Sequence, residues 1–418
     1  MMRKKIIPVM WGVLILMVFL LAMQLYDYWQ KNMHEEIHTE ETRELTILST
    51  YEEPYIRSAL THITENYVKQ NPELKVTLQF VNSADFQKKI CLLKDAKNLP
   101  ELIICDNVMT PALVSMGIYQ DISNRIGEKK ADQYIQAAFN TGLINGKNYT
   151  LPFAADAYVL YYNKSFFEKN NFDAPKSLTE LQNMLNSVHT LGNYNFAMAC
   201  KNEEDITGAF LQMVYLFGGN ILDLDGKGSL QFYSMLENFR DNNVFPKDMV
   251  NWNQQDLMKA FSEEMVMTAV AKLSSLPLLK QNKRDFEYGI MEIPYEHNQA
   301  YLLHGENIGI TVDVNDKEVW DLLEYMTGKE AAQVFADETG KFPIRIDGEY
   351  AMLQEEGMDE NFIQRERSQS MGKKSYSTWF LISSAISEQL LDFLTTSIDA
   401  ESAAHNMQES VREAILER

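Results

Sequence analysis

Asp106 and Asp156 are the two carboxylates whose places in the sequence favour contact with a small ligand. Asp106 follows the short apolar run 102–104, and a carboxylate at the end of a buried strand can face a crevice and accept two hydroxyl hydrogen atoms from a polyol. An Asp at this position could equally cap the helix that follows. Asp156 follows Pro152 and precedes the apolar run 157–162, where it could contact a ligand or form a salt bridge at a hinge.

Four aromatic residues are candidate platforms for a sugar, because flat apolar rings suit the C–H faces of pyranose rings. They are Tyr51, Tyr158, Trp252 and Trp379. Tyr51 precedes Glu52 and Glu53, and Glu52 is a further candidate ligand contact, although this acidic pair also fits the N-terminus of a helix. Aromatic side chains lie more often in a protein core than in a binding site, so packing is the alternative role for all four.

No arrangement of residues in the sequence predicts a catalysed reaction. The seven histidines show no His-Glu-x-x-His spacing, and neither a Gly-x-Ser-x-Gly elbow nor a Walker-type glycine loop occurs. Asp106 and Asp156 could serve as the acid and base of a glycosidase, since that chemistry needs two flanking carboxylates, but the sequence does not give their separation. We therefore expect a binding protein, with a glycoside hydrolase as the alternative.

Metal and cofactor sites are not expected from the sequence. Cys91, Cys105 and Cys200 form no C-x-x-C pair, and an odd number of cysteines cannot form a closed disulfide framework. The run 223–226, Asp-Leu-Asp-Gly, begins like a calcium loop but lacks the later ligands, so it predicts a turn.

The composition indicates a folded protein of more than one domain that does not bind nucleic acid. With 418 residues and about 150 residues as the usual domain size, two or three domains are expected. Hydrophobic residues make up 45% of the chain, which excludes a natively unfolded protein. The net charge of −21 would repel phosphate backbones, whose binding depends on Lys and Arg.

The N-terminus carries a predicted membrane signal. Residues 6–26 contain no charge, and a helix of that length spans the ~30 Å hydrocarbon core of a bilayer. The tip, 1–5, is basic and the polar spacer 27–44 is acidic, so the positive-inside rule places the tip in the cytoplasm and the rest outside. The run ends without a small-x-small cleavage site, which favours an uncleaved transmembrane anchor over a cleaved signal peptide, the alternative.

The elements that position Asp106 begin with an alternation of strands and helices. Apolar patterning predicts strands at 45–49, 74–81 and 102–104, separated by helices at 54–69 and 84–94. Such alternation requires right-handed crossovers and predicts a mainly parallel sheet that is covered on both faces.

A second α/β block begins near residues 149–152. Its predicted strands are 157–162, 195–200, 266–270 and 288–293, and its predicted helices are 165–169, 178–190, 207–217, 229–241 and 254–261. After residue 315 the pattern is almost wholly helical, with helices predicted at 317–326, 330–338, 362–367, 379–394 and 400–416. The sequence therefore predicts an α/β protein with a helical C-terminal region.

One segment of the second block resembles a known family. Residues 151–164 read Leu-Pro-Phe-Ala-Ala-Asp-Ala-Tyr-Val-Leu-Tyr-Tyr-Asn-Lys, which is similar to a signature of the family 1 extracellular solute-binding proteins of ATP-driven importers. That signature has a proline, a carboxylate and a tyrosine-rich strand ending in Tyr-Asn-Lys. Supporting matches are Phe-Gly-Gly-Asn at 217–220, Thr-Gly-Lys-Phe-Pro-Ile-Arg at 339–345 and the terminal pair of helices, so the resemblance covers most of residues 45–418.

The resemblance implies a two-lobed, type II fold like that of periplasmic binding proteins. Lobe 1 would contain residues 45–153 and 300–342, and lobe 2 residues 154–299 and 343–418, with crossings near 152–157, 294–306 and 340–344. The ligand would lie in the cleft between the lobes. This agrees with the general rule that ligands of open α/β sheets bind beyond the carboxyl ends of strands and between domains.

The resemblance also assigns roles to the candidate residues. Asp106 and Asp156 match positions where relatives place ligand-binding carboxylates, and Trp379 falls where relatives carry a stacking aromatic residue. Tyr158 is favoured because it stands two residues past Asp156. The chain departs from many relatives at 269–273, which read Ala-Val-Ala-Lys-Leu where those relatives have Gly-x-Trp, so one aromatic platform is missing.

These expectations combine into an extracytoplasmic receptor that captures a saccharide between two lobes and delivers it to the permease of an ABC-type importer. The chain lacks the lipid-modified cysteine of Gram-positive relatives after its apolar run, and a transmembrane anchor could replace the lipid. We expect a monomer with no cofactor. The alternatives are a polyamine or other cationic ligand, favoured by the acidic residues, and a receptor that signals to a membrane kinase.

Overall fold

The computed structural model describes most of the chain outside its N-terminal end. The described residues are 17–28, 42–188, 192–281, 287–297, 302–312, 314, 316–349, 358, 362, 365, 371–372 and 376–417. The chain divides into two compact units, one of residues 1–44 with 68–75 and the other of residues 45–67 with 76–418.

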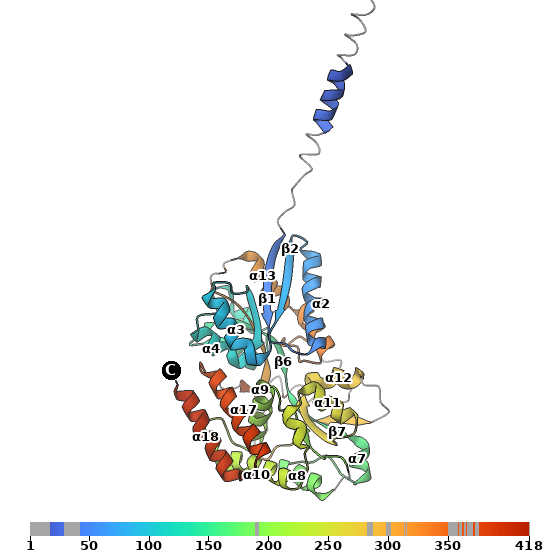
Figure 1. Cartoon of the computed structure of the whole chain (residues 1–418), viewed down its shortest axis with the longest axis vertical. Helices are drawn as coiled ribbons and strands as arrows, with labels where there is room; N and C mark the ends of the chain where they lie inside the picture. Colours follow the sequence, from blue (N-terminus) through green and yellow to red (C-terminus); the bar gives the residue numbers. More distant parts are fainter. Residues whose placement is uncertain are drawn as a thin grey trace, which may run out of the picture. The chain divides into compact units, whose positions relative to one another are not determined.

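The smaller unit holds the described part of the predicted membrane signal. Residues 17–28 form a helix (Figure 1). Its side chains are exposed. In the part of the chain that the structure describes, no helix has the length and apolar character needed to cross a membrane. Residues 6–16 of the predicted span, and most of the predicted spacer, lie outside the described residues.

Two β-sheets lie mainly in the larger unit, and the first of them carries Asp106. Its strand order is β12 (Met371–Gly372), β11 (Leu302–Ile310), β3 (Leu102–Asp106), β1 (Arg43–Ser49) and β2 (Leu74–Phe80), and β6 (Thr150–Asp156) pairs with β11. β1 and β3 are parallel, with Ile47 opposite Leu102, which confirms the predicted crossover connection. β11 runs antiparallel to β3 and β6, so the sheet is mixed rather than mainly parallel.

The central strand β11 was missed by the sequence analysis. Its sequence, Leu-Leu-His-Gly-Glu-Asn-Ile-Gly-Ile, has the glycines and polar residues of a connecting segment. It is nevertheless buried along almost its whole length, because β3 and β6 flank it. Gly305 has a φ of +148°, and a Cβ atom there would meet the Ala154 carbonyl oxygen at 2.2 Å, so the close approach of β6 requires glycine.

Helices cover the first sheet, and one of them packs against Tyr51 in the segment that follows β1. They are α2 (Pro54–Gln70), α3 (Ser83–Asp95), α4 (Thr110–Ser115), α5 (Glu128–Ala131), α6 (Gln136–Asn140), α13 (Lys317–Met326) and α14 (Lys329–Thr339). Two short strands, β4 (Leu143–Ile144) and β5 (Lys147–Asn148), form a separate hairpin. Phe335 of α14 packs on Phe153 of β6 with ring centroids 4.8 Å apart, and the Tyr51 ring lies 5.8 Å from Phe335.

The second sheet has the order β10 (Tyr288–Met291), β7 (Tyr158–Asn163), β9 (Thr268–Lys272) and β8 (Ala197–Met198). Strand β7 is antiparallel to both of its neighbours, whereas β8 and β9 are parallel. The predicted strand 195–200 is shortened to β8, because the N–H groups of Asn195 and Phe196 both donate to the Val244 carbonyl instead of to a strand.

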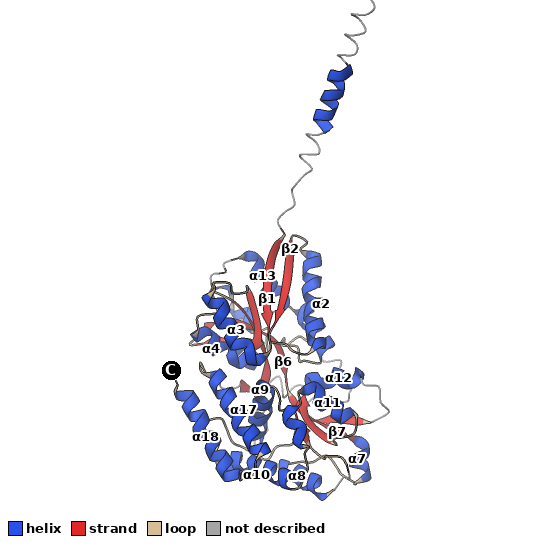
Figure 2. Ribbon diagram, viewed as in Figure 1, coloured by secondary structure: helices blue, strands red, loops and turns tan. Residues whose placement is uncertain are grey.

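Helices surround the second sheet, as Figure 2 shows. They are α7 (Lys164–Lys169), α8 (Leu178–Ser187), α9 (Glu203–Leu216), α10 (Lys227–Asp241), α11 (Gln254–Ser262), α12 (Leu276–Gln281), α17 (Trp379–Thr395) and α18 (Ala400–Leu416). The last two helices form the predicted terminal pair, and α17 packs against α9. Most of the predicted helix 362–367 lies outside the described residues.

The chain passes from the first sheet to the second at Ala157, which is the single residue between β6 and β7. This residue lies in the segment 152–157 that was predicted to cross. Phe342, after α14, forms an isolated antiparallel bridge with Ala155 beside this point. Two distant parts of the chain therefore meet where the two sheets join.

Candidate functional site

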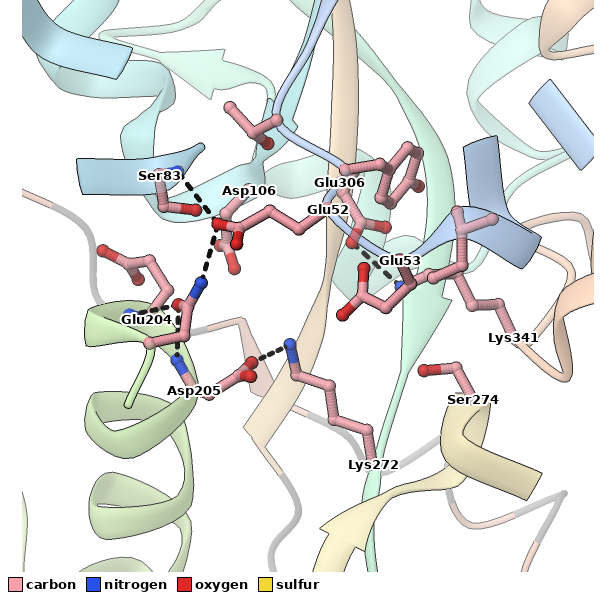
Figure 3. Close-up of a pocket in the computed structure, with 14 residues that line it drawn as sticks. Glu52, Glu53, Ser83, Asp106, Glu204, Asp205, Lys272, Ser274, Glu306 and Lys341 are labelled. Carbon is pink, nitrogen blue, oxygen red and sulfur yellow. Dashed lines mark hydrogen bonds and ion pairs between the residues drawn. The ribbon is translucent and has the colours of Figure 1, made fainter. Parts of the chain in front are cut away.

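A cavity lies where the two sheets present their connecting segments to each other (Figure 3). The first sheet contributes the β1–α2 connection, the end of β3, part of β11 and the segment after α14. The second contributes the beginning of α9 and the end of β9. The lining residues are Thr50, Tyr51, Glu52, Glu53, Ile56, Ser83, Asp106, Asn202, Glu204, Asp205, Lys272, Ser274, Glu306 and Lys341.

The cavity is small in this conformation. Its volume is about 50 Å³, and a buried water molecule needs roughly 10–15 Å³, so the space accommodates only a few water molecules. A sugar ring does not fit into it. A ligand of that size therefore requires the walls of the cavity to move apart.

Charged side chains dominate the lining. Six carboxylates, from Glu52, Glu53, Asp106, Glu204, Asp205 and Glu306, face two lysines, Lys272 and Lys341. With all eight side chains ionised, the lining carries a net charge of −4, which is two positive charges minus six negative ones. Apart from Tyr51 and Ile56, the lining is polar.

Both lysines are held by carboxylates. Lys341 Nζ lies 2.9 Å from Glu306 Oε1 and 3.2 Å from Asp156 Oδ2, and Lys272 forms an ion pair with Asp205. Burial alone would lower the pKa of each lysine, but the neighbouring carboxylates raise the pKa of Lys341, and raise that of Lys272 well above its ordinary value. Both ammonium groups are therefore charged at neutral pH.

Burial acts in the opposite sense on two of the acids. It raises the pKa of Glu53, although the charges of Lys272 and Lys341 oppose this effect, and it raises the pKa of Glu306 against the opposing charge of Lys341. Figure 3 shows the Glu53 side chain pointing into the cavity. These two carboxyl groups lose their protons less readily than exposed carboxyls do.

Tyr51, a predicted ligand contact, is part of the cavity wall. Its side chain is 5% exposed, and Lys341 Nζ lies 5.4 Å from its ring centroid. The hydroxyl group interacts with the Glu306 carboxylate, but within the described residues neither the hydroxyl nor Glu306 Oε2 forms a well-aligned hydrogen bond. Burial first, and then the nearby Glu306 carboxylate, raise the pKa of Tyr51 well above its ordinary value, so the phenol remains neutral.

Glu52, also predicted as a contact, connects the two sides of the cavity. Its Oε1 accepts a 3.1 Å hydrogen bond from the Ser83 backbone N–H and a 2.9 Å hydrogen bond from Asn202 Nδ2. Asn202 is the N-cap of α9, because its side-chain oxygen accepts from the N–H groups of Glu204 and Asp205. The pair therefore joins α3 of the first side to α9 of the second.

Asp106 performs the capping role that the sequence analysis kept as its alternative, and it also lines the cavity. Its Oδ1 accepts a 3.1 Å hydrogen bond from the Val108 N–H at the start of the 3₁₀ helix Asn107–Met109. The side chain is only half-buried and faces the cavity. Asp106 thus caps a helix and faces the cavity at the same time, as the two alternatives in the sequence analysis predicted separately.

Asp156 lies behind the cavity wall and is not among the lining residues. It is 1% exposed, and it accepts hydrogen bonds from Ser274 Oγ at 2.5 Å and from Lys341 Nζ at 3.2 Å. Because it stands next to the crossing residue Ala157, this arrangement matches the hinge salt bridge that was the alternative role. A direct contact with ligand stays a prediction.

The structure buries Tyr158 and Trp379 behind the acidic residues at the beginning of α9. Tyr158 is 1% exposed and donates a 2.8 Å hydrogen bond to the Asp205 carbonyl oxygen. Trp379 is fully buried, and its Nε1 donates to Glu204 Oε1 at 3.0 Å. The two aromatic residues position lining residues from behind, and their contact with ligand stays a prediction.

Trp252 does not come together with the other candidates. It is half-buried at the end of the 3₁₀ helix Lys247–Asn251, where its carbonyl accepts from the N–H groups of Cys200 and Lys201, and it is absent from the cavity lining.

Several lining residues were missed in the sequence, and some of them had a recognisable signal. Asn202 followed by Glu203, Glu204 and Asp205 is a helix-capping pattern that could have marked the beginning of α9. Lys272 stands in the segment 269–273 whose aromatic platform was noted as missing, and it contributes an ammonium group there. Glu306 had no such signal, since its strand was not predicted.

Two α/β lobes with a polar cavity between them define a two-lobed solute-binding fold. The chain belongs to the family of bacterial extracellular solute-binding proteins, which matches its residues 62–347. This confirms the resemblance that was inferred from residues 151–164.

Two relatives are similar to this chain at low sequence identity. A putative binding protein of Brucella abortus (strain 2308) is 21% identical over 293 residues, which are 68% of this chain and 71% of that protein. A multiple sugar-binding protein of Streptococcus mutans is 21% identical over 318 residues, which cover 70% of this chain and 73% of that protein.

Solved structures share the fold. A solute-binding protein from Thermotoga lettingae bound with alpha-D-tagatose has a TM-score of 0.77 at 20% identity, covering 89% of this chain and 100% of that one. Maltose-bound MalE3 of T. maritima also has a TM-score of 0.77, at 17% identity, covering 88% and 99%. At such identities the likeness establishes the fold and leaves the ligand open.

Proposed function

We propose that the protein is a receptor that captures a saccharide in the cleft between its lobes and delivers it to an ABC-type importer. The observation that carries the proposal is the cavity lined from both lobes by carboxylates, which are strong hydrogen-bond acceptors for hydroxyl groups. Membership of the solute-binding family and the sugar-binding relatives support it. Release to a permease and the monomeric state are parts of the same proposal.

The proposed mechanism is closure of the lobes around the ligand. Lobe 1 would comprise residues 45–153 and 300–342, and lobe 2 residues 154–299 and 343–418. The small volume of the cavity, and the Glu52–Asn202 hydrogen bond across it, support a cycle in which the lobes open to admit the ligand. The protein catalyses no reaction in this cycle.

We further propose that residues 6–26 anchor the receptor in the plasma membrane, with residues 1–5 in the cytoplasm. The support is the uncharged run itself and its charge-sorted flanks. Cell fractionation with N-terminal sequencing tests this: intact chain in the membrane fraction is expected, and soluble extracellular protein beginning near residues 22–45 would contradict it.

A thermal-shift screen of the full-length chain in detergent tests the binding function. A saccharide that binds the native state raises the melting temperature as its concentration exceeds the dissociation constant. Failure of every mono- and oligosaccharide to shift the melting temperature would reject the saccharide proposal. Appearance of hydrolysis products during the incubation would favour the glycoside hydrolase alternative instead.

A further inference from the structure

We propose that the ligand of this cavity carries at least one protonated amine alongside its hydroxyl groups. The inference rests on the proposed binding function and narrows its ligand class from neutral saccharides to basic ones, such as an amino sugar with a free amine. The shared chemistry, an ammonium group, also occurs in polyamines, and the experiment below separates the two.

The first argument is the imbalance of charge. Lys272 and Lys341 are already engaged by Asp205, Glu306 and Asp156. Glu52, Glu53 and Asp106 also line the cavity, and within the described residues none of the three forms an ion pair with Lys or Arg. Glu53 and Asp106 are half-buried and Glu52 is exposed, so the three carboxylates give the cavity a negative potential that attracts a positive charge.

The second argument is the kind of hydrogen-bonding group that the cavity offers. Within the described part of the chain, the Tyr51 hydroxyl and Glu306 Oε2 are buried oxygen atoms that interact with each other but form no well-aligned hydrogen bond, and both residues belong to the lining. An ammonium group has three donors and no acceptor, so it satisfies oxygen atoms without adding lone pairs of its own. A hydroxyl group supplies one donor and brings two lone pairs into a lining that is already rich in acceptors.

The third argument is the aromatic ring. The Lys341 ammonium group lies 5.4 Å from the Tyr51 ring centroid, so the protein itself already places a cation beside this ring. Tyr51 is the one aromatic residue among the described lining residues. The cavity therefore favours a cation near an aromatic face over the stacking of several sugar rings.

Matched oligosaccharides provide the experiment, because they differ only in the amine. Isothermal titration calorimetry of the full-length chain in detergent compares glucosamine and its β-1,4 tetramer with N-acetylglucosamine and its tetramer, and includes spermidine as the polyamine probe. We expect an amine-bearing probe to bind at least tenfold more tightly than its acetylated counterpart. Raising the salt concentration from 50 to 500 mM should weaken that binding severalfold.

Two variants locate the effect in the cavity. Glu53→Gln and Asp106→Asn each remove one negative charge and keep the side-chain size, and Asn can replace Asp as a helix cap, so both should fold. Each should weaken binding of the amine probe about tenfold. Asp225→Asn, at an exposed turn away from the cavity, removes the same charge and should leave the affinity unchanged.

The outcomes are distinct. Preference for the free-amine sugars supports the inference in full, and preference for spermidine supports the ammonium chemistry while it rejects the saccharide part of the proposed function. Equal or tighter binding of the acetylated sugars, insensitive to salt, would overturn the inference and leave the proposed function intact. No binding of any probe up to millimolar concentration would overturn the inference as well.

Discussion

Asn202 Nδ2 donates a 2.9 Å hydrogen bond to Glu52 Oε1, although 150 positions separate the two residues in the chain. Because Glu52 follows β1 and Asn202 caps α9, the bond closes the cavity from opposite sides. Glu52, which was predicted to touch ligand, thus contacts the other lobe in this conformation. A ligand that enters the cavity must break this bond or take its place.

Removal of the bond should shift the ligand-free protein towards a more open form. Glu52→Ala deletes the acceptor, and Asn202→Ser deletes the donor but keeps a good N-cap residue for α9. One such hydrogen bond contributes about 0.5–1.5 kcal/mol, which is enough to change the populations of two nearly equal states severalfold. Small-angle scattering of each variant should give a larger radius of gyration than that of the parent protein. Identical curves for all three proteins would show that the Glu52–Asn202 hydrogen bond does not hold the lobes together.

Ligand binding itself should have the opposite effect on the same measurement. If closure captures the ligand, saturation with a binding saccharide or amine lowers the radius of gyration of a protein that samples open forms. Glu52→Ala, being more open at the outset, should show the larger change. A scattering curve that saturating ligand leaves unaltered in both proteins is incompatible with the hinge mechanism.

Asp156→Ala should destabilise the protein strongly. The substitution leaves the buried Lys341 ammonium with Glu306 as its remaining carboxylate partner and removes the acceptor of the Ser274 hydroxyl. Breaking one partner of a buried ion pair costs about 3–5 kcal/mol, whereas replacing both partners by apolar residues is much less harmful. Denaturant unfolding should therefore show a larger loss for Asp156→Ala than for the triple variant Asp156→Ala, Lys341→Met, Glu306→Gln, in which no member of the cluster keeps an unpaired charge.

The Asp156→Ala variant also distinguishes between the two roles predicted for Asp156, ligand contact and hinge salt bridge. If it contacts ligand directly, calorimetry should show affinity falling about tenfold to a hundredfold while stability is kept, because a hydrogen bond to a charged group contributes about 1.5–3 kcal/mol. If Asp156 instead forms the hinge salt bridge, the free energy of unfolding should fall more than the free energy of ligand binding does.

Trp379→Phe should remove a hydrogen bond that holds the Glu204 carboxylate in place. The ring can remain in the core, but the 3.0 Å hydrogen bond from Nε1 to the Glu204 carboxylate is lost. Loss of a buried donor costs about 1–3 kcal/mol, which urea unfolding can measure. Trp252→Phe is the matched control, since that residue lies outside the cavity lining and should change neither stability nor affinity appreciably. Loss of affinity at unchanged stability in Trp379→Phe would instead support the stacking role first predicted.

Local patterns were sufficient to predict most of the fold. Apolar runs with turn-forming residues between them marked β1, β3 and β7, because a strand that is buried on both faces needs apolar residues along its whole length. The apolar run of β3 also predicted that Asp106 stands at the end of that strand, and the structure places Asp106 there, in the cavity lining. The pattern failed for β11, whose burial depends on two neighbouring strands that only the tertiary fold supplies.

The charged cluster could not be predicted in this way. Lys341 meets Asp156 from 185 positions away and Glu306 from 35 positions away, and no local periodicity encodes such contacts. Sequence reasoning also favoured aromatic residues as ligand platforms, whereas Tyr158 and Trp379 are buried and use their polar atoms to hold α9. An aromatic residue near a site does not reveal whether its face or its polar atom is the part in use.

The raised pKa of Glu53 makes the stability of the ligand-free protein depend on pH. Burial is the largest cause and the charge of Asp205 adds to it, while Lys272 and Lys341 oppose them. From its ordinary pKa of 4.5 upward, the ligand-free folded state therefore holds more protons on Glu53 than the unfolded state does, so this group's contribution to stability falls as pH rises through that window. Glu306, whose pKa is raised by burial against the charge of Lys341, acts in the same direction.

Binding of an amine should show the opposite trend. An ammonium group favours the ionised form of Glu53, so amine affinity should rise with pH through the same window, and binding should release protons. Calorimetry in two buffers of different ionisation enthalpy measures this release directly. Glu53→Gln should reduce both the proton release and the slope of affinity against pH, whereas Asp225→Asn should not change either. An amine affinity that is independent of pH from 4.5 to 7.5 would show that Glu53 does not respond to the ligand.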